Sequence, residues 1–183
     1  MDGTDNSHAG GAVDTAAWVE AVVTEHEKPL LRYAARIVNC PVAAQDVVQK
    51  VFIKLAQMPE AQALDSGRLK GWLYRVTHNE AVDHVRRESR LHLLHERQSA
   101  DPMFAAPEAV SDPNPHDERV QLVLTEVRRL RPQEQQVILL RLQEGLSYRE
   151  ISAATGRSEG HVGNLLHHAV KKLSGRLARA MKS

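Results

Sequence analysis

The chain has 183 residues, a formal net charge of +1 and an aromatic content of 4%. This length suits one or two small domains, and the scarcity of aromatic residues favours helices packed through Leu, Val and Ala over a β-sandwich. No apolar run approaches the ~20 residues that span a membrane, the acidic N-terminus lacks the features of a signal peptide, and the single Cys40 excludes an internal disulfide. We therefore expect a cytoplasmic protein.

The small net charge conceals two basic segments separated by an acidic one. Residues 66–98 carry seven Lys or Arg against four acids, and residues 147–183 carry seven against two. Between them, residues 99–127 carry six acids against one Arg. This alternation indicates two separate contacts with a polyanion such as nucleic acid.

The first half of the chain predicts a helical domain over residues 14–95. Residues 1–13 are predicted to be disordered, and the helix that follows, 14–38, contains Pro29, which can kink or divide it. A break at 39–41 precedes a helix over 42–57, and residues 58–70 are predicted to form a loop. The next helix runs from 71 to at least 90. Its expected inward residues are Trp72, Leu73, Val76, Ala81, Val82 and Val85, and its expected outward residues are Arg75, His78, Asn79, Arg86, Arg87 and Arg90.

The second half predicts a flexible linker and a second helical domain. Residues 96–115 form the predicted linker, because four prolines lie there among Ala, Ser and Asp. Helical periodicity resumes over 116–130, and Pro132 opens another helix that Gly145 closes. The predicted fold is therefore all-α, with a second small domain over 116–183.

Residues 147–173 have the pattern of a helix-turn-helix. Ser147 and Glu150 have the spacing of a capping box, and Gly156 supplies the left-handed residue that ends the first helix. Ser158 can cap the second helix, whose buried face carries Val162, Leu166, Leu173 and either Ala169 or Val170. Such a pair places its second helix in the major groove of DNA, although an ordinary αα-hairpin has the same pattern.

Catalytic and metal-binding patterns are weak in this sequence. It has no glycine-rich phosphate loop and no His-Glu-x-x-His arrangement. His92 and His95 are spaced for a metal, but no Cys or acidic residues complete a ligand set. We therefore expect no catalytic site, no metal and no cofactor.

Four stretches follow one another in a recognisable order: LLRYAARIV (30–38), AAQDVVQKVFIKLA (43–56), LKGWLYRVTHNEAVDHVRRESR (69–90) and LRPQEQQVILLRLQEGLSYREISAATGRSEGHVGNLLHHAVKKL (130–173). Together they resemble the extracytoplasmic-function group of bacterial sigma factors, of the sigma-70 type. The first three resemble region 2, which includes a helix that binds the clamp of the polymerase largest subunit and a helix that melts and reads the −10 element. The last resembles region 4, which holds the −35 element and the polymerase flap.

The resemblance implies contacts for polymerase and for the −10 element. Asp46, Gln49 and Phe52 fall at the polymerase-binding positions, where Lys50 replaces the usual acid. His78 replaces a usual basic residue and would be partly charged near neutral pH. Trp72 either supports an unstacked base or belongs to the core. The expected −10 contacts are Trp72, Tyr74, Arg75, His78, Asn79, Asp83, Arg86, Arg87 and Arg90.

For the −35 element, the resemblance points to the second helix of the helix-turn-helix. Gly163 and Leu165 replace the Lys and Arg that would meet DNA in the family. Asn164 can bond an adenine edge, and nearby lysines can hold phosphates. The expected −35 contacts are Ser158, Glu159, His161, Asn164, His167, His168, Lys171 and Lys172.

The resemblance implies a non-catalytic initiation subunit that directs core RNA polymerase to specific promoters. Its implied partners are core RNA polymerase, through the clamp and the flap, and promoter DNA, with an anti-sigma protein as a further candidate. Two alternatives stay open. One is a dimeric helix-turn-helix regulator that needs no polymerase, and the other is a nuclease that uses Asp46, Asp83 and a histidine.

Overall fold

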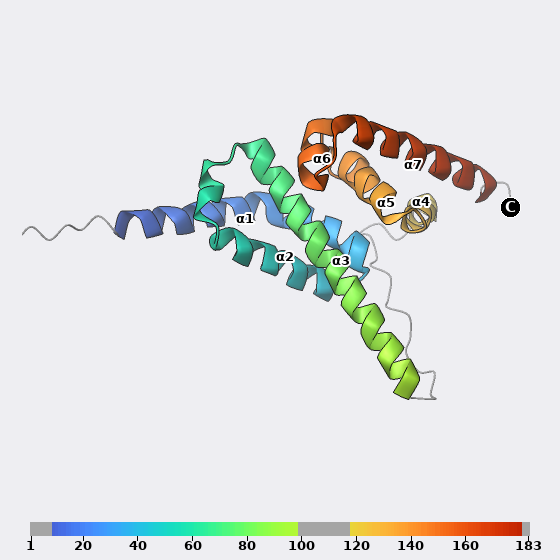
Figure 1. Cartoon of the computed structure of the whole chain (residues 1–183), viewed down its shortest axis with the longest axis horizontal. Coiled ribbons are helices and arrows are strands. Elements are labelled where there is room, and N and C mark those ends of the chain that lie inside the picture. The colour runs from blue at the N-terminus through green and yellow to red at the C-terminus, as the bar shows by residue number, and fades with distance from the viewer. Residues whose placement is uncertain (1–8, 99–117, 181–183) are drawn as a thin grey trace, which may run out of the picture.

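The computed structural model describes residues 9–98 and 118–180, and the regular structure within these ranges is helical (Figure 1). The first unit contains α1 (Ala9–Val38), α2 (Pro41–Ala56), a 3-10 turn (Pro59–Ala63) and α3 (Ser66–Gln98). The second contains α4 (Glu118–Arg128), α5 (Pro132–Ile138), a π-helical turn (Leu139–Gln143), α6 (Tyr148–Thr155) and α7 (Glu159–Ala180). The predicted all-α fold with two helical domains is confirmed.

The first unit is a three-helix bundle in which α1, α2 and α3 pack against one another. Pro41 occupies the first turn of α2, where its missing amide hydrogen costs no helical hydrogen bond. Beyond the bundle, α3 continues as a projecting arm (Figure 1). The bundle core is made of fully buried apolar side chains from all three helices: Leu30, Tyr33, Ala34, Val47, Val51, Leu55, Leu73 and Ala81.

Several helix boundaries differ from the predicted ones. The first helix begins at Ala9, before the predicted start at residue 14, and it continues through Pro29 without division. α3 begins at Ser66, because the Asp65 carboxylate accepts the Arg68 amide at 2.9 Å and caps the helix there. It ends at Gln98, past the predicted start of the linker at 96, and the remainder of that linker lies outside the described residues.

The helix-turn-helix of the second unit forms as its sequence predicts. The Glu150 amide donates to Ser147 Oγ at 3.2 Å, and the Ser147 amide donates to the Glu150 carboxylate at 2.7 Å. Gly156 ends α6 with a φ of +68°, a conformation that favours glycine. Of the two alternatives for the buried stripe of α7, Ala169 is buried and Val170 is 49% exposed.

The two units contact each other through α3 and α6. The helix that carries the expected −10 contacts is therefore covered, over part of its length, by the helix-turn-helix unit (Figure 1). No helix among the described residues has the length and apolarity needed to cross a membrane.

Candidate nucleic-acid interface

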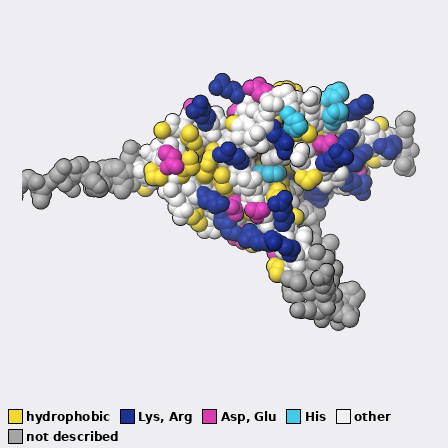
Figure 2. Space-filling view, in the orientation of Figure 1, with side chains coloured by type: hydrophobic (Ala, Val, Ile, Leu, Met, Phe, Trp, Pro, Cys, Tyr) yellow, Lys and Arg dark blue, Asp and Glu magenta, His cyan; other side chains and the backbone are white. Residues whose placement is uncertain are grey.

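The arm of α3 presents a row of exposed arginines. Arg75, Arg86, Arg87 and Arg90 are all exposed, as are Asn79 and Asp83 between them. Figure 2 shows Lys and Arg side chains gathered over this part of the first unit and again over the second. Arg86 pairs with Asp83 at 3.5 Å, with both side chains more than half exposed. Such an exposed pair is weak, so the guanidinium groups stay available to phosphates.

The aromatic residues at the start of α3 are less accessible than the arginines. Tyr74 is 3% exposed and donates its hydroxyl hydrogen to the Glu144 carboxylate at 2.7 Å. Burial and this bond both raise the pKa of Tyr74. Trp72 is half-buried and packs against the core. In this arrangement Tyr74 has no open face for a base, and Trp72 has a partial one.

His78 does not face outward as predicted. Its Nδ1 lies 3.0 Å from the Tyr33 hydroxyl, because this turn of α3 is covered by α1 and by the second unit. Burial lowers the pKa of His78 to about 4. The side chain is therefore neutral near pH 7, and the predicted partial charge is wrong for this arrangement.

A polar cleft lies between the two units at this point. It has a volume of about 310 Å³. Arg75, His78 and Asn79 form one wall. The other wall comes from the second unit, through Pro132, Gln133, Gln136, Ala154, Thr155 and Arg157. Three expected −10 contacts thus line a cleft whose other wall is protein, although Arg75 and Asn79 stay exposed to solvent there.

The outward face of α7 carries the expected −35 contacts and several histidines (Figure 2). Ser158 is a cap, since its hydroxyl accepts the His161 amide at 3.3 Å. The side chain of Leu165 is half-buried against the core, so this position faces packing as well as solvent. The exposed residues on this face are Glu159, His161, Asn164, His167, His168 and Lys171.

Lys172 has a structural partner that sequence analysis missed. Its ammonium bonds the carboxylate of Glu134, a residue that is 5% exposed on α5. Burial raises the pKa of Glu134, but the bonds from Lys172 and from the Arg131 amide outweigh that effect and hold the pKa below its usual value. A second buried acid, Glu126 on α4, pairs with Arg129 at 2.7 Å and with Arg176 at 3.7 Å. These pairs tie α7 to α4 and α5.

Comparison with known proteins assigns both units. The Sigma-70 region 2 family matches residues 22–91, and the Sigma-70 region 4 family matches residues 121–173. The chain is 30% identical over 167 residues to the extracytoplasmic-function (ECF) sigma factor SigL of Mycobacterium tuberculosis, covering 90% of this chain and 92% of SigL. The chain belongs to the ECF group of RNA polymerase sigma factors. It is also 32% identical over 168 residues to SigE of Mycolicibacterium smegmatis, of whose length it spans 62%.

Two solved structures share the fold. RpoE of Bartonella quintana, solved with the anti-sigma factor NepR, has a TM-score of 0.66 at 21% identity, covering 87% of this chain and 96% of that one. CnrH, solved with the cytosolic domain of CnrY, has a TM-score of 0.65 at 24% identity, covering 93% and 94%. The first unit of this sigma factor is thus region 2, and the second is region 4.

The residues expected to bind polymerase lie together on α2 of region 2. Asp46, Gln49 and Lys50 are exposed, and Phe52 is half-buried. Phe52 also lines an apolar cleft of about 570 Å³ between α1 and α2. Ile53, which sequence analysis left out, lines the same cleft and is 49% exposed. This face combines an apolar groove with a charged rim, as protein interfaces do.

Within the described residues, no three or more His, Cys, Asp or Glu side chains are grouped so that they could hold a metal ion. Asp46 and Asp83, which the nuclease alternative requires, lie on α2 and α3 respectively.

Proposed function

We propose that this sigma factor directs core RNA polymerase to specific promoters, recognising the −35 element through region 4 and melting and reading the −10 element through region 2. The observation that carries the proposal is that the two units, which match Sigma-70 regions 2 and 4, each present an exposed polar face: the arginine row of α3 and the outward face of α7. It would act in the cytoplasm, where polymerase and promoters are.

The α3 row supports a contact with a separated DNA strand. Arg86, Arg87 and Arg90 can neutralise phosphates, and each neutralised phosphate releases counterions. Asn79 lies on the same helix and offers amide donors and acceptors that can bond a base edge. Phosphate contacts position the strand and the amide reads it, which is the division of roles found in specific recognition.

The α7 face supports a weaker, positioning contact. Asn164 is exposed at the centre of the face and can bond adenine, with a discrimination of about 1–3 kcal/mol against a wrong base. Lys171 is exposed and can hold a phosphate, whereas Lys172 is already bonded to Glu134. Two modest contacts on one chain bind with the benefit of effective concentration.

The α2 face supports binding to the polymerase clamp. Gln49 and Phe52 line the apolar cleft, and Asp46 and Lys50 are exposed on the same helix. We also propose that an anti-sigma protein regulates this chain. RpoE, which shares its fold, was solved with the anti-sigma factor NepR, and CnrH, which also shares it, was solved with the cytosolic domain of CnrY.

The test is run-off transcription with core RNA polymerase, together with co-purification of the full-length chain and that enzyme. Asp46→Arg should abolish co-purification, whereas the matched control Glu60→Arg, on the exposed 3-10 turn of the same region, should retain it. Asn164→Ala should relax discrimination at one −35 position by about 1–3 kcal/mol. Tight binding of promoter DNA by a dimer, with no effect on polymerase, would favour the regulator; DNA cleavage abolished by a chelator would favour the nuclease.

A further inference from the structure

Regions 2 and 4 approach each other closely at a glycine of α3. A Cβ placed at Gly71 of α3 would lie 2.9 Å from the Cβ of Ala153 on α6 and 3.5 Å from the Ala153 carbonyl carbon. Non-bonded carbon atoms prefer about 3.5–4.0 Å. Because Ala153 Cβ is fixed to its backbone, any larger residue at 71 would force the helices apart. Gly71 therefore forms a seat for α6 on α3.

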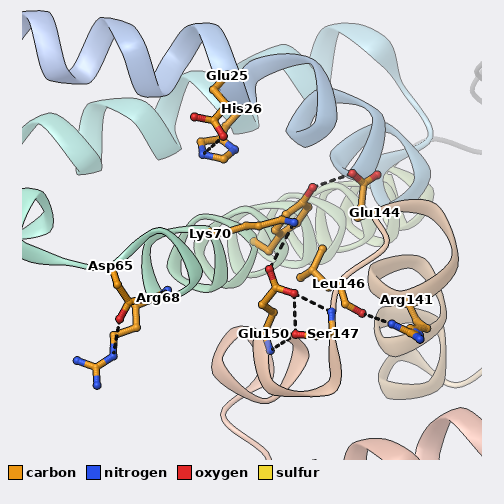
Figure 3. Close-up of polar contacts among 11 residues, drawn as sticks. Glu25, His26, Asp65, Arg68, Lys70, Arg141, Glu144, Leu146, Ser147 and Glu150 are labelled. Carbon is orange, nitrogen blue, oxygen red and sulfur yellow. Dashed lines mark hydrogen bonds and ion pairs between the residues drawn. The ribbon is translucent and has the colours of Figure 1, made fainter.

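Two carboxylates of region 4 bond region 2 on either side of this seat. Glu144, whose side chain is 2% exposed, accepts the Tyr74 hydroxyl at 2.7 Å and lies 3.6 Å from the Arg32 guanidinium. Glu150 lies 3.5 Å from the Lys70 ammonium while it also bonds Ser147 (Figure 3). A buried carboxylate is costly unless it is bonded. Within region 4, Glu144 accepts the Gln143 side-chain amide at 2.7 Å, and region 2 adds the Tyr74 hydroxyl and the positive charge of Arg32.

The seat and the two bonds cover part of the DNA-binding face. Arg75, His78 and Asn79 open into the polar cleft, and its far wall belongs to region 4. A DNA strand cannot pass along this part of α3 while region 4 stands opposite. The arginines at the free end of α3 stay exposed, so the closed arrangement blocks base reading more than phosphate contact.

The closed arrangement also cannot span a promoter. The positions that name the −10 and −35 elements differ by about 25 base pairs. At 3.4 Å per base pair, this is about 85 Å along the duplex. In this structure α3 and α7 both pack against α6. Packed helices lie about 8–10 Å apart, so the axes of α3 and α7 are within about 20 Å of each other near α6.

We propose that the α3–α6 junction is an intramolecular latch, built from Gly71 seated on Ala153 and from the bonds of Glu144 and Glu150 to region 2. The latch holds the chain closed, and promoter recognition requires it to open. This inference rests on the proposed function, since it regulates the same DNA contacts. The apparent dissociation constant for a promoter complex equals the intrinsic constant divided by the open fraction. Weakening the latch therefore tightens binding without adding a contact.

The first experiment measures opening in the full-length chain. Spin labels are placed at Gln62→Cys in region 2 and Thr125→Cys in region 4, both exposed and outside the junction, in a Cys40→Ser background. The parent should give one narrow distance distribution. Two unrelated changes should add a second population at a different distance: Gly71→Ala, which adds the clashing Cβ, and Glu144→Lys, which places an ammonium opposite Arg32.

Matched controls separate opening from misfolding. Gly175→Ala changes a glycine of α7 that has no atom within 4 Å of an added Cβ, and Glu60→Lys makes the same charge change on an exposed turn. Both controls should keep the parent distribution. All variants should keep the helix content of the parent by circular dichroism.

The second experiment measures the consequence for promoter binding. With core RNA polymerase, the sigma concentration that gives half-maximal promoter complex should fall about tenfold for both opening variants and stay unchanged for the controls. An unchanged distance distribution in both opening variants would overturn the latch, and so would opening without any gain in promoter complex. A parent chain that never supports run-off transcription would refute the proposed function and the promoter role of the latch, while the distances would still establish the closed geometry.

Discussion

Two adjacent lysines of α7 allow structural support to be separated from DNA contact. Lys172 bonds the buried carboxylate of Glu134, whereas Lys171 is exposed on the outward face. Lys172→Ala would leave Glu134 with its bond from the Arg131 amide at 3.2 Å and with the smaller effect of the Arg131 charge in place of the bonded ammonium. We expect this change to lower the free energy of unfolding of region 4 by about 2 kcal/mol.

The magnitude follows from the burial of the two partners. Removing one partner of a fully buried ion pair costs about 3–5 kcal/mol. The side chain of Lys172 is 39% exposed, so water can replace part of what it supplies to Glu134, whose side chain is 6% exposed. A hydrogen bond to a charged group contributes about 1.5–3 kcal/mol, which brackets the expected loss. In a domain of 60–100 residues, about 2 kcal/mol lowers Tm by about 8–16 °C.

Thermal and urea unfolding of the full-length chain provide the measurement. Lys171→Ala should change stability by no more than about 0.5 kcal/mol while it weakens DNA binding. Because the folded-state pKa of Glu134 lies below its ordinary value of 4.5, its stabilisation is present above that value and lost as the pH falls through the folded pKa. The gap in unfolding free energy between the parent and Lys172→Ala should therefore narrow as the pH falls below 4.5. Equal stability of the two lysine variants at pH 7 would refute the reasoning.

Three further predictions address the DNA contact, the pH response and helix stability. Replacing Arg86 and Arg87 with Ala should weaken promoter opening and reduce the slope of log affinity against log salt by about 1.4, and an unchanged slope would contradict the placement of α3 on DNA. Because burial lowers the pKa of His78 from 6.5 to about 4, the stability of the folded chain should fall as the pH drops from 6.5 to 4, by at most about 3 kcal/mol, and His78→Gln should remove this dependence in urea unfolding. Gly163→Ala should stabilise α7 by about 0.5–1 kcal/mol, because an added Cβ would meet Tyr148 at an ordinary 3.7 Å, and a lower Tm would contradict this.

The helix-turn-helix could be predicted because its signals are local. Ser147 and Glu150 are three residues apart, and their reciprocal bonds need no information from elsewhere in the chain. Gly156 ends α6 for an equally local reason, the ease with which glycine adopts a positive φ. The cap at Asp65 was also local and readable, and overlooking it placed the start of α3 too late.

The environment of α3 could not be predicted in the same way. Helical periodicity predicts which face a helix turns toward its own domain. For α3 this prediction is correct at Leu73 and Ala81, which are both buried. It carries no information about a second domain that covers the opposite side. Tyr74 and His78 were therefore assigned to DNA, although the structure bonds them to Glu144 and Tyr33 respectively.

Gly163 and Leu165, which replace the family's Lys and Arg in the recognition helix, differ in their surroundings. Leu165 is half-buried against the core, so an apolar side chain at this position contributes packing within region 4. Gly163 has no side chain to offer DNA, and a Cβ added there would only reach ordinary contact with the Tyr148 ring, at 3.7 Å. Since Lys172 is also bonded to Glu134, the α7 face keeps few side chains for DNA. We therefore expect region 4 alone to bind a promoter weakly. We expect its contribution to require that region 2 and polymerase are bound to the same DNA, so that the second contact forms at a high effective concentration.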